Sequence, residues 1–224
     1  MRGVFVTGTD TGVGKTLACC ALIHALREAG ARPVPMKPIA AGVAARDLPN
    51  EDTMALMSAA ALDPSWADAI TPVLLREPMA PHIAASREGR RLSLDFLAPG
   101  LARLATAGDF LVVEGVGGFK VPLAEDLDTV DLARAVALPV VLVVGLRLGC
   151  LNHALLTAQA IDAAGLPLAG WIANAIDPEM PVREDNVAAL EARLPAPLLG
   201  RLPYAAAPDA RALSQELRVA ALLA

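Results

Sequence analysis

The chain has 224 residues, of which 55% are hydrophobic, and its 24 acidic and 19 basic side chains give a net charge of −5. This composition excludes general disorder, and no dense basic segment is present that would favour nucleic-acid binding. The longest uncharged apolar stretch, residues 135–146, is too short to span a bilayer, so we expect no membrane segment.

The first residues show no basic region followed by a cleavage site, which predicts a cytoplasmic protein rather than a secreted one. The cysteines Cys19, Cys20 and Cys150 lack the spacing of metal ligands. They are therefore interpreted as buried thiols of a reducing compartment.

Apolar runs alternate with helical patterns along the whole chain. Strands are predicted over residues 3–7, 34–37, 110–114, 140–145, 170–174 and 198–202. Helices are predicted over residues 16–29, 52–62, 94–107, 130–137, 152–164 and 183–193, with Gly30, Gly108 and Gly165 at helix C-termini. This alternation predicts a single α/β domain over residues 1–224, with a doubly wound, mostly parallel sheet flanked by helices.

Residues 8–16, Gly-Thr-Asp-Thr-Gly-Val-Gly-Lys-Thr, lie between the first predicted strand and the first predicted helix. In this context a glycine-rich loop can cradle phosphates with its backbone N–H groups. Lys15 would reach the β- and γ-phosphates, and the Thr16 hydroxyl would bind Mg²⁺. The first glycine, Gly8, stands one residue earlier than in the usual pattern. A glycine-rich turn without a ligand is the alternative, but the strand, the Gly-Lys-Thr sequence and the helix together favour a P-loop ATP site.

Three further charged residues are candidates for the same site. Glu114 ends an apolar strand before a glycine-rich segment, where a carboxylate needs a cation such as Mg²⁺ nearby. Lys37 ends the second strand and could hold a phosphate or a developing anion, or be an ordinary surface lysine. Asp52 lies at a helix start, where it either stabilises the helix through interaction with the helix dipole or acts as a second carboxylate near Mg²⁺.

The sequence does not assign a role to two of the histidines, His82 and His153. His82 lies in residues 78–82, which are predicted to form a rigid loop, and it could cap, pack or catalyse. His153 follows Asn152, which is predicted to be the N-cap of the helix over residues 152–164.

A series of motifs in this chain resembles the dethiobiotin synthetase family, the ATP-dependent enzymes of biotin biosynthesis. The motifs follow the family's order over nearly the full length: residues 6–16, Lys37-Pro38, residues 81–83, residues 113–118, residues 148–154, residues 170–174 and residues 197–200. The shifted first glycine of the P-loop is also a family feature.

The resemblance implies a reaction. The family carboxylates an amine of 7,8-diaminononanoate (7,8-diaminopelargonate) with CO₂ to give a carbamate. The carbamate oxygen attacks the γ-phosphate of ATP, which gives a carbamic-phosphoric anhydride. The second amine then closes the ring, and dethiobiotin, ADP and phosphate are released.

The resemblance also implies roles for individual residues. It places catalysis on Thr11, Lys15 and Lys37, and the Mg²⁺ ligands on Thr16, Asp52 and Glu114. ATP would be bound by Gly12, Val13, Gly14, Lys15, Thr16, Leu17, Asp52, Glu114, Gly117, Asn174, Pro203 and Tyr204. The substrate would be bound by Lys37, Ala41, Gly149, Cys150, Leu151 and Asn152, the last four across the interface of a homodimer.

Ala41 is a departure from the family pattern. The family commonly has Ser or Thr at this position of the loop that begins with Lys37-Pro38, and the hydroxyl contacts the substrate. One hydrogen bond is therefore expected to be missing, worth about 0.5–1.5 kcal/mol between neutral groups.

Two other functions remain as alternatives at this point. A partition-type regulatory ATPase has a similar sheet and P-loop, but it usually carries a second lysine early in that loop, and residues 8–13 contain none. A cobyrinate-amidase-like ATPase domain would also need a glutaminase domain, for which 224 residues leave no room.

Overall fold

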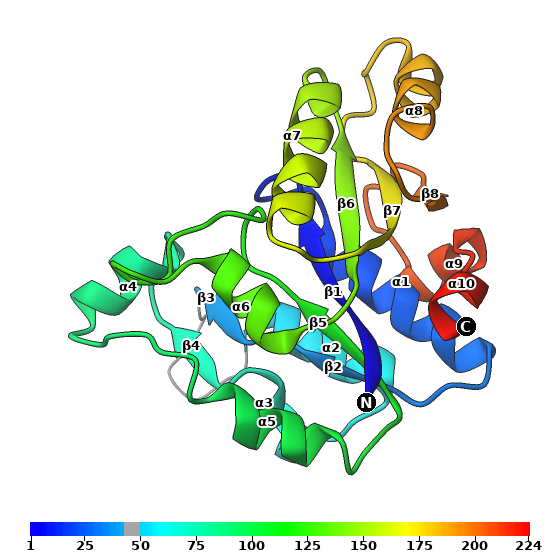
Figure 1. Ribbon diagram of the computed structural model, residues 1–224. Coiled ribbons are helices and arrows are strands. Elements are labelled where there is room, and N and C mark those ends of the chain that lie inside the picture. The colour runs from blue at the N-terminus through cyan, green and yellow to red at the C-terminus, as the bar shows by residue number, and fades with distance from the viewer. Residues whose placement is uncertain (43–49) are drawn as a thin grey trace.

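The centre of the computed structural model is a six-stranded, all-parallel sheet with the strand order β2-β5-β1-β6-β7-β8 (Figure 1). The structure describes residues 1–42 and 50–224. The strands are β1 (Arg2–Gly8), β2 (Pro33–Met36), β5 (Phe110–Glu114), β6 (Val140–Leu146), β7 (Leu168–Ala175) and β8 (Leu198–Leu202). All six were predicted from their apolar runs, and the doubly wound parallel fold is confirmed.

Two strands escaped the prediction. β3 (Ile39–Ala41) and β4 (Val73–Leu75) form a separate two-stranded parallel sheet. Each strand has only three residues, which is too short to produce a periodic pattern in the sequence. β3 begins soon after the end of β2, and its residues Ala40 and Ala41 line the cleft described below.

The six predicted helices are present, with ends shifted by at most three residues. They are α1 (Lys15–Glu28), α2 (Glu51–Ala60), α5 (Leu97–Leu104), α6 (Thr129–Val136), α7 (Cys150–Ala163) and α8 (Arg183–Glu191). Shorter helices were not predicted: η1 (Pro64–Trp66), α3 (Ala67–Ile70), α4 (Pro81–Arg87), α9 (Ala210–Leu213), η2 (Ser214–Glu216) and α10 (Ala220–Leu223).

Alternate residues of the central strands pack against helices on opposite faces of the sheet. Val4 and Val6 of β1 share a core cluster with α1, whereas Phe5 faces the cluster that includes side chains of α5 and α6. Leu142 and Val144 of β6 pack with buried residues of α7 and α8. In Figure 1, α6 and α7 lie in front of the sheet and α1 lies behind it. Strands covered on both faces explain the continuous apolar runs.

Three local predictions are corrected by the structure. His82 lies inside α4 rather than in a loop, because Pro81 occupies the first helical turn, where its missing N–H is not needed. The N-cap of α7 is Gly149, with φ 94°, and Asn152 lies within the first turn. Gly108 is not a helix C-cap: a Cβ there would lie 2.1 Å from the Arg32 carbonyl oxygen, so close backbone packing requires a glycine. Gly30 and Gly165 do follow α1 and α7 in the left-handed conformation.

The cysteines are buried and free, as predicted. Burial, with a smaller contribution from Glu114, raises the pKa of Cys20 to about 12, so its thiol stays protonated at neutral pH. Within the part of the chain that the structure describes, no helix combines the length and apolar character needed to cross a bilayer.

Candidate active site

A cleft of about 640 Å³ opens at the carboxyl ends of β1 and β5, beside the small β3–β4 sheet. Ten of the predicted site residues line it: Thr11, Gly12, Gly14, Lys15, Thr16, Lys37, Ala41, Asp52, Glu114 and Gly117. This edge of a doubly wound sheet is where ligands are expected, because the strand order reverses beside β1. A second hollow of about 540 Å³, beside α4, contains none of the predicted site residues.

The loop between β1 and α1 has the conformation of a phosphate cradle. Gly12 and Gly14 adopt left-handed conformations with φ 74° and 83°, and Gly14 is the N-cap of α1. The first residues of α1, at the positive end of its dipole, line the cleft together with Gly12 and Gly14, which suits an anion. Lys15 Nζ donates to the Asp10 carbonyl oxygen at 3.0 Å. Burial, and then the positive charge of Lys37, lowers the pKa of Lys15.

Four polar side chains from four separate segments meet at the base of the cleft. The Thr16 hydroxyl lies 2.9 Å from Asp52 Oδ1 and 2.8 Å from Glu114 Oε1. Lys37 Nζ lies 3.0 Å from Asp52 Oδ2 and also forms an ion pair with Glu114. Lys37 directly follows β2, Glu114 ends β5, and Thr16 and Asp52 lie in the first turns of α1 and α2.

This cluster is strongly charged and largely buried. The side chains of Lys37 and Glu114 are only 5% and 1% exposed. Burial by itself lowers the pKa of Lys37, but the Glu114 and Asp52 carboxylates outweigh it and the pKa is raised above its ordinary value. Burial would raise the pKa of Asp52, yet the Lys37 ammonium and the Thr16 hydroxyl bring it below its ordinary value. Both groups are therefore charged at neutral pH.

The donor set fits a magnesium ion bound together with a nucleotide. Glu114 Oε2 is buried and has no hydrogen-bond partner among residues 1–42 and 50–224. A buried carboxylate oxygen left without a partner is costly, and a cation would satisfy it. The described residues contain no cluster of three or more His, Cys, Asp or Glu side chains that could hold a metal alone. Two carboxylates and one hydroxyl suit Mg²⁺, which keeps waters and phosphate oxygens as its other ligands.

Asn174 approaches the same loop from β7. Its Nδ2 donates to the Val13 carbonyl oxygen at 2.9 Å, and the side chain is buried. A Cβ at Gly14 would lie 2.1 Å from this Nδ2, so the amide packs directly against the loop. Asn174 thus braces the phosphate loop, a contact that the motifs do not reveal. The remaining predicted ATP-binding residues Val13, Leu17, Pro203 and Tyr204 do not line the cleft.

Residues 149–152, the N-cap and first turn of α7, lie apart from the cleft. None of Gly149, Cys150, Leu151 and Asn152 lines it. The Cys150 side chain is buried in the core and its N–H donates to the Arg147 carbonyl oxygen at 3.0 Å. Cys150 therefore offers neither a side chain nor a free N–H to a ligand at this helix start.

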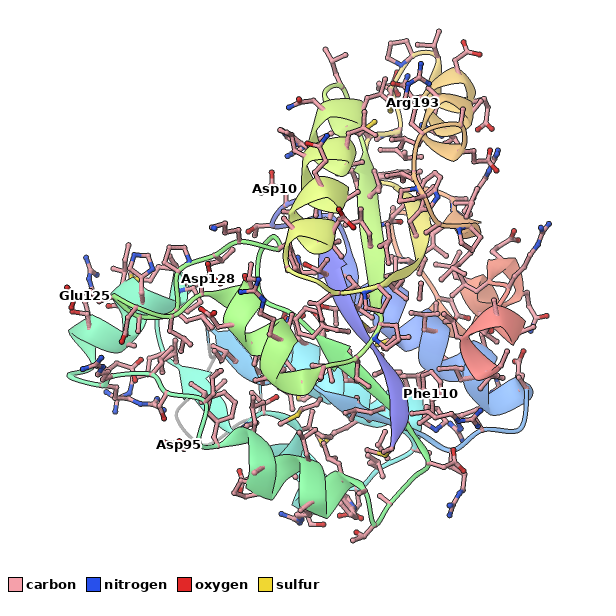
Figure 2. All side chains as sticks on the ribbon, viewed as in Figure 1. Asp10, Asp95, Phe110, Glu125, Asp128 and Arg193 are labelled. Carbon is pink, nitrogen blue, oxygen red and sulfur yellow. The ribbon has the colours of Figure 1, made fainter. Side chains whose placement is uncertain are left out.

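One contact between the loop after β1 and the loop after β6 was not predicted from the sequence. Arg147 Nη2 lies 2.5 Å from Asp10 Oδ2, across 137 positions of the chain. Figure 2 labels Asp10 at the carboxyl end of β1. The rule that polar residues directly after a strand are site candidates would have found Arg147, which follows β6.

Comparison with known proteins assigns the chain to a family. A family model described as an AAA domain matches residues 2–211. The ATP-dependent dethiobiotin synthetase BioD of Ralstonia nicotianae is 52% identical over 222 residues, covering 98% of this chain and 96% of that protein. The proteins of the same name from Nitrosospira multiformis and Aromatoleum aromaticum are 51% and 48% identical, over 98% and 97% of this chain and 96% and 97% of their own lengths. The chain belongs to the dethiobiotin synthetase family.

Solved structures with the same fold are more distant. The septum site-determining protein MinD of Pyrococcus horikoshii, complexed with Mg-ADP, superposes with a TM-score of 0.57 at 18% identity, covering 90% of this chain and 81% of that one. A ParA family ATPase of Chlorobium tepidum gives 0.54 at 15% identity, covering 99% and 89%. At this identity the likeness concerns the fold alone. The partition-type alternative is disfavoured by the family assignment, in agreement with the absence of lysine from residues 8–13.

Proposed function

We propose that this protein is an ATP-dependent dethiobiotin synthetase: it carboxylates 7,8-diaminononanoate with CO₂ and closes the ring, releasing ADP and phosphate. The observation that carries the proposal is the near full-length identity of 48–52% to proteins of that name, combined with one cleft that gathers Lys15, Lys37, Asp52 and Glu114. In this proposal residues 1–224 act as a single P-loop ATP-binding domain.

The Thr16 hydroxyl and the Asp52 and Glu114 carboxylates are the proposed ligands of Mg²⁺. Their support is the mutual distance of the three groups and the unpartnered Glu114 Oε2. Bound there with the nucleotide, Mg²⁺ would neutralise charge on the phosphate oxygens.

Lys15 and Lys37 are proposed to provide the fixed positive charge that the reaction needs. An anionic carbamate has to approach an anionic phosphate, and pre-positioned cations lower that barrier. Lys15 reaches the cleft from the phosphate loop, while Lys37 reaches it from the end of β2. The pKa of Lys37 is raised by its carboxylate neighbours, so the ammonium is ready to stabilise an anion.

Thr11 and Ala41 are proposed to border the reacting amines. Both line the cleft, Thr11 from the phosphate loop and Ala41 from β3. Ala41 offers no hydroxyl to the substrate. The adenine is proposed to lie beyond the phosphate loop toward Asn174, with Pro203 and Tyr204 after β8 beside it; Tyr204 is exposed and free to contact a ring.

A homodimer is proposed in which residues 149–152 of one copy hold the substrate's carboxylate tail in the cleft of the other. Within the described residues, the backbone N–H groups of Leu151 and Asn152 have no acceptor, and they lie at the start of the 14-residue helix α7. Such a helix start favours an anion. Leu148 is 90% exposed beside them, and Leu156 of α7 is exposed as well, which gives apolar surface for a second copy to cover.

The reaction is tested by ADP release with purified protein, ATP, Mg²⁺, bicarbonate and a vicinal diamine that carries a carboxylate chain. ADP should form only when all components are present, together with a cyclic urea identified by mass spectrometry. Equal ATP hydrolysis without the diamine would contradict the proposal, and stimulation by DNA or a protein partner would favour a regulatory ATPase.

A further inference from the structure

The ion pair between Asp10 and Arg147 joins the phosphate loop to the neighbouring strand end. Asp10 Oδ1 accepts from the backbone N–H of Thr11 at 2.7 Å, and Oδ2 accepts from Arg147 at 2.5 Å. The Asp10 carbonyl oxygen accepts from Lys15 at 3.0 Å. Thus a single residue, Asp10, orients two residues of the cleft wall while its own carboxylate is held by Arg147.

The position of this carboxylate creates an electrostatic problem for a nucleotide site. Asp10 directly precedes Thr11, and Thr11, Gly12 and Lys15 line the cleft. An unpaired negative charge here would repel the phosphates of a nucleotide in the loop. The side chains of Asp10 and Arg147 are 45% and 41% exposed, so water screens the repulsion without abolishing it.

We propose that Arg147 is a positioning residue for the nucleotide: it neutralises Asp10 and holds the carboxylate against the end of β6, away from the phosphates. Neither side chain lines the cleft, so the role is exerted through the loop rather than by contact with the nucleotide. The inference rests on the proposed binding of ATP in this cleft. It adds to the site a residue that lies outside the phosphate-loop motif.

The chain contains a matched ion pair that serves as a control. Asp109 Oδ1 accepts from the backbone N–H of Arg32 at 2.8 Å, and Oδ2 pairs with Arg32 Nε at 3.1 Å. Arg32 and Asp109 precede β2 and β5, so this pair lies at the amino ends of the strands, on the edge of the sheet opposite the cleft. Arg32→Gln therefore removes the same charge from a similar arrangement far from the phosphates.

The test is equilibrium titration of the full chain with the Mg²⁺ complex of a non-hydrolysable ATP analogue at low ionic strength. Arg147→Gln should weaken binding by about three- to fivefold, the upper range for partly exposed charges, while Arg147→Lys and Arg32→Gln stay within about 1.5-fold of the unmodified protein. The double variant Asp10→Asn/Arg147→Gln should recover most of the affinity, because neither charge then remains. The loss in Arg147→Gln should shrink as salt is added.

If the Asp10–Arg147 ion pair only stabilises the fold, the affinities of the variants should differ from those above. Arg147→Gln would then bind the analogue as tightly as Arg32→Gln, or its weak binding would persist in the double variant and at high salt; either result would overturn the inference. Thermal unfolding of each variant checks that the fold is retained. Tight analogue binding by the unmodified protein without dethiobiotin formation would contradict the proposed function alone. No analogue binding by the unmodified protein would overturn both.

Discussion

Two halves of the carboxyl edge of the sheet are organised differently. Around the ends of β1, β2 and β5, Lys37 pairs with both Asp52 and Glu114. The side chains of Lys37 and Glu114 are enclosed, whereas that of Asp52 is 39% exposed. Beyond β6 and β8, residues 149–152 and 203–204 lie outside the cleft and contribute exposed side chains such as Tyr204. In the first half charged groups of this chain pair with one another, whereas the second half presents exposed groups to solvent.

The difference follows from burial. A carboxylate that is 1% exposed at the end of β5 requires a cation, and the fold supplies Lys37 in direct contact. Exposed side chains after β6 and β8, such as Asn152 and Tyr204, are solvated and need no internal partner. We infer that the enclosed half carries the phosphate chemistry and that the open half contributes recognition, and each prediction below tests one side of this division.

The largest effect is expected for Lys37→Gln. If Lys37 stabilises the carbamate and the transition state, as we propose, loss of its charge should lower kcat on the order of 10²–10³-fold, as for loss of one oxyanion donor. Lys15 belongs to the phosphate cradle, so ATP affinity should change much less. Turnover measured beside isothermal titration with a non-hydrolysable ATP analogue separates the two quantities.

Lys37→Leu removes the charge together with its hydrogen bonds and should be at least as harmful. If either variant loses ATP affinity in proportion to its rate, Lys37 has no separate catalytic role. Thermal unfolding is needed as a control, because Glu114 would be left without its ammonium partner.

A somewhat smaller effect is expected for Glu114→Gln. The amide keeps the size of the side chain but is a poor ligand for Mg²⁺, so the Mg²⁺ concentration needed for half-maximal turnover should rise by at least about tenfold. The unmodified and variant proteins are compared over a Mg²⁺ titration at fixed ATP. An unchanged Mg²⁺ dependence would mean that Glu114 only pairs with Lys37.

The enclosed half was predictable from the sequence to a large extent. Lys15 and Thr16 follow the loop after β1, Lys37 follows β2 and Glu114 ends β5, and parallel strands bring such positions to one edge. The ion pairs of Lys37 with Asp52 and Glu114 were not predictable, because they depend on side-chain direction across separate segments. The motifs gave the position of each group but not which groups touch.

The features that were not predicted are either very short elements or contacts between residues far apart in the sequence. β3 and β4 have three residues each, and α4 begins with Pro81 in a segment rich in proline, which looked like a loop. The contact of Arg147 with Asp10 spans 137 positions and belongs to no single motif. Local patterns are informative for long elements, and the structure is needed for contacts between distant loops.

The open half is tested by Asn152→Ala. If residues 149–152 bind the carboxylate tail in a second copy, loss of the amide should raise the KM for the diamine by about tenfold, the lower range for a hydrogen bond to a charged group. ATP affinity should stay unchanged, because Asn152 does not line the cleft of its own chain.

Mixing of variants shows whether the site is shared between copies. Glu114→Gln damages the cleft and Asn152→Ala damages the segment given to the other copy, so a dimer of one variant with the other contains one intact site. When the two variants are mixed and exchange subunits at random, about half of the dimers are mixed. At low diamine concentration the mixture should therefore reach about one quarter of the unmodified activity. A mixture no more active than the mean of its separate components would place both residues in the same site or contradict the dimer.

The smallest effect is expected for Ala41→Ser, which adds a hydroxyl to the wall of the enclosed half. Ala41 lines the cleft at the end of β3, and the next residue, Gly42, is held by an N–H bond to the Leu75 carbonyl oxygen at 3.0 Å, so the backbone is fixed. A serine hydroxyl there should tighten diamine binding by at most about tenfold, since one neutral hydrogen bond is worth no more than about 1.5 kcal/mol. Ala41→Val is the matched control, because it adds volume without a hydrogen-bonding group and should not tighten binding. Equal diamine Kd values for Ala41→Ser and the unmodified protein would show that position 41 does not face the amine, and the assignment of this wall to the substrate would fail.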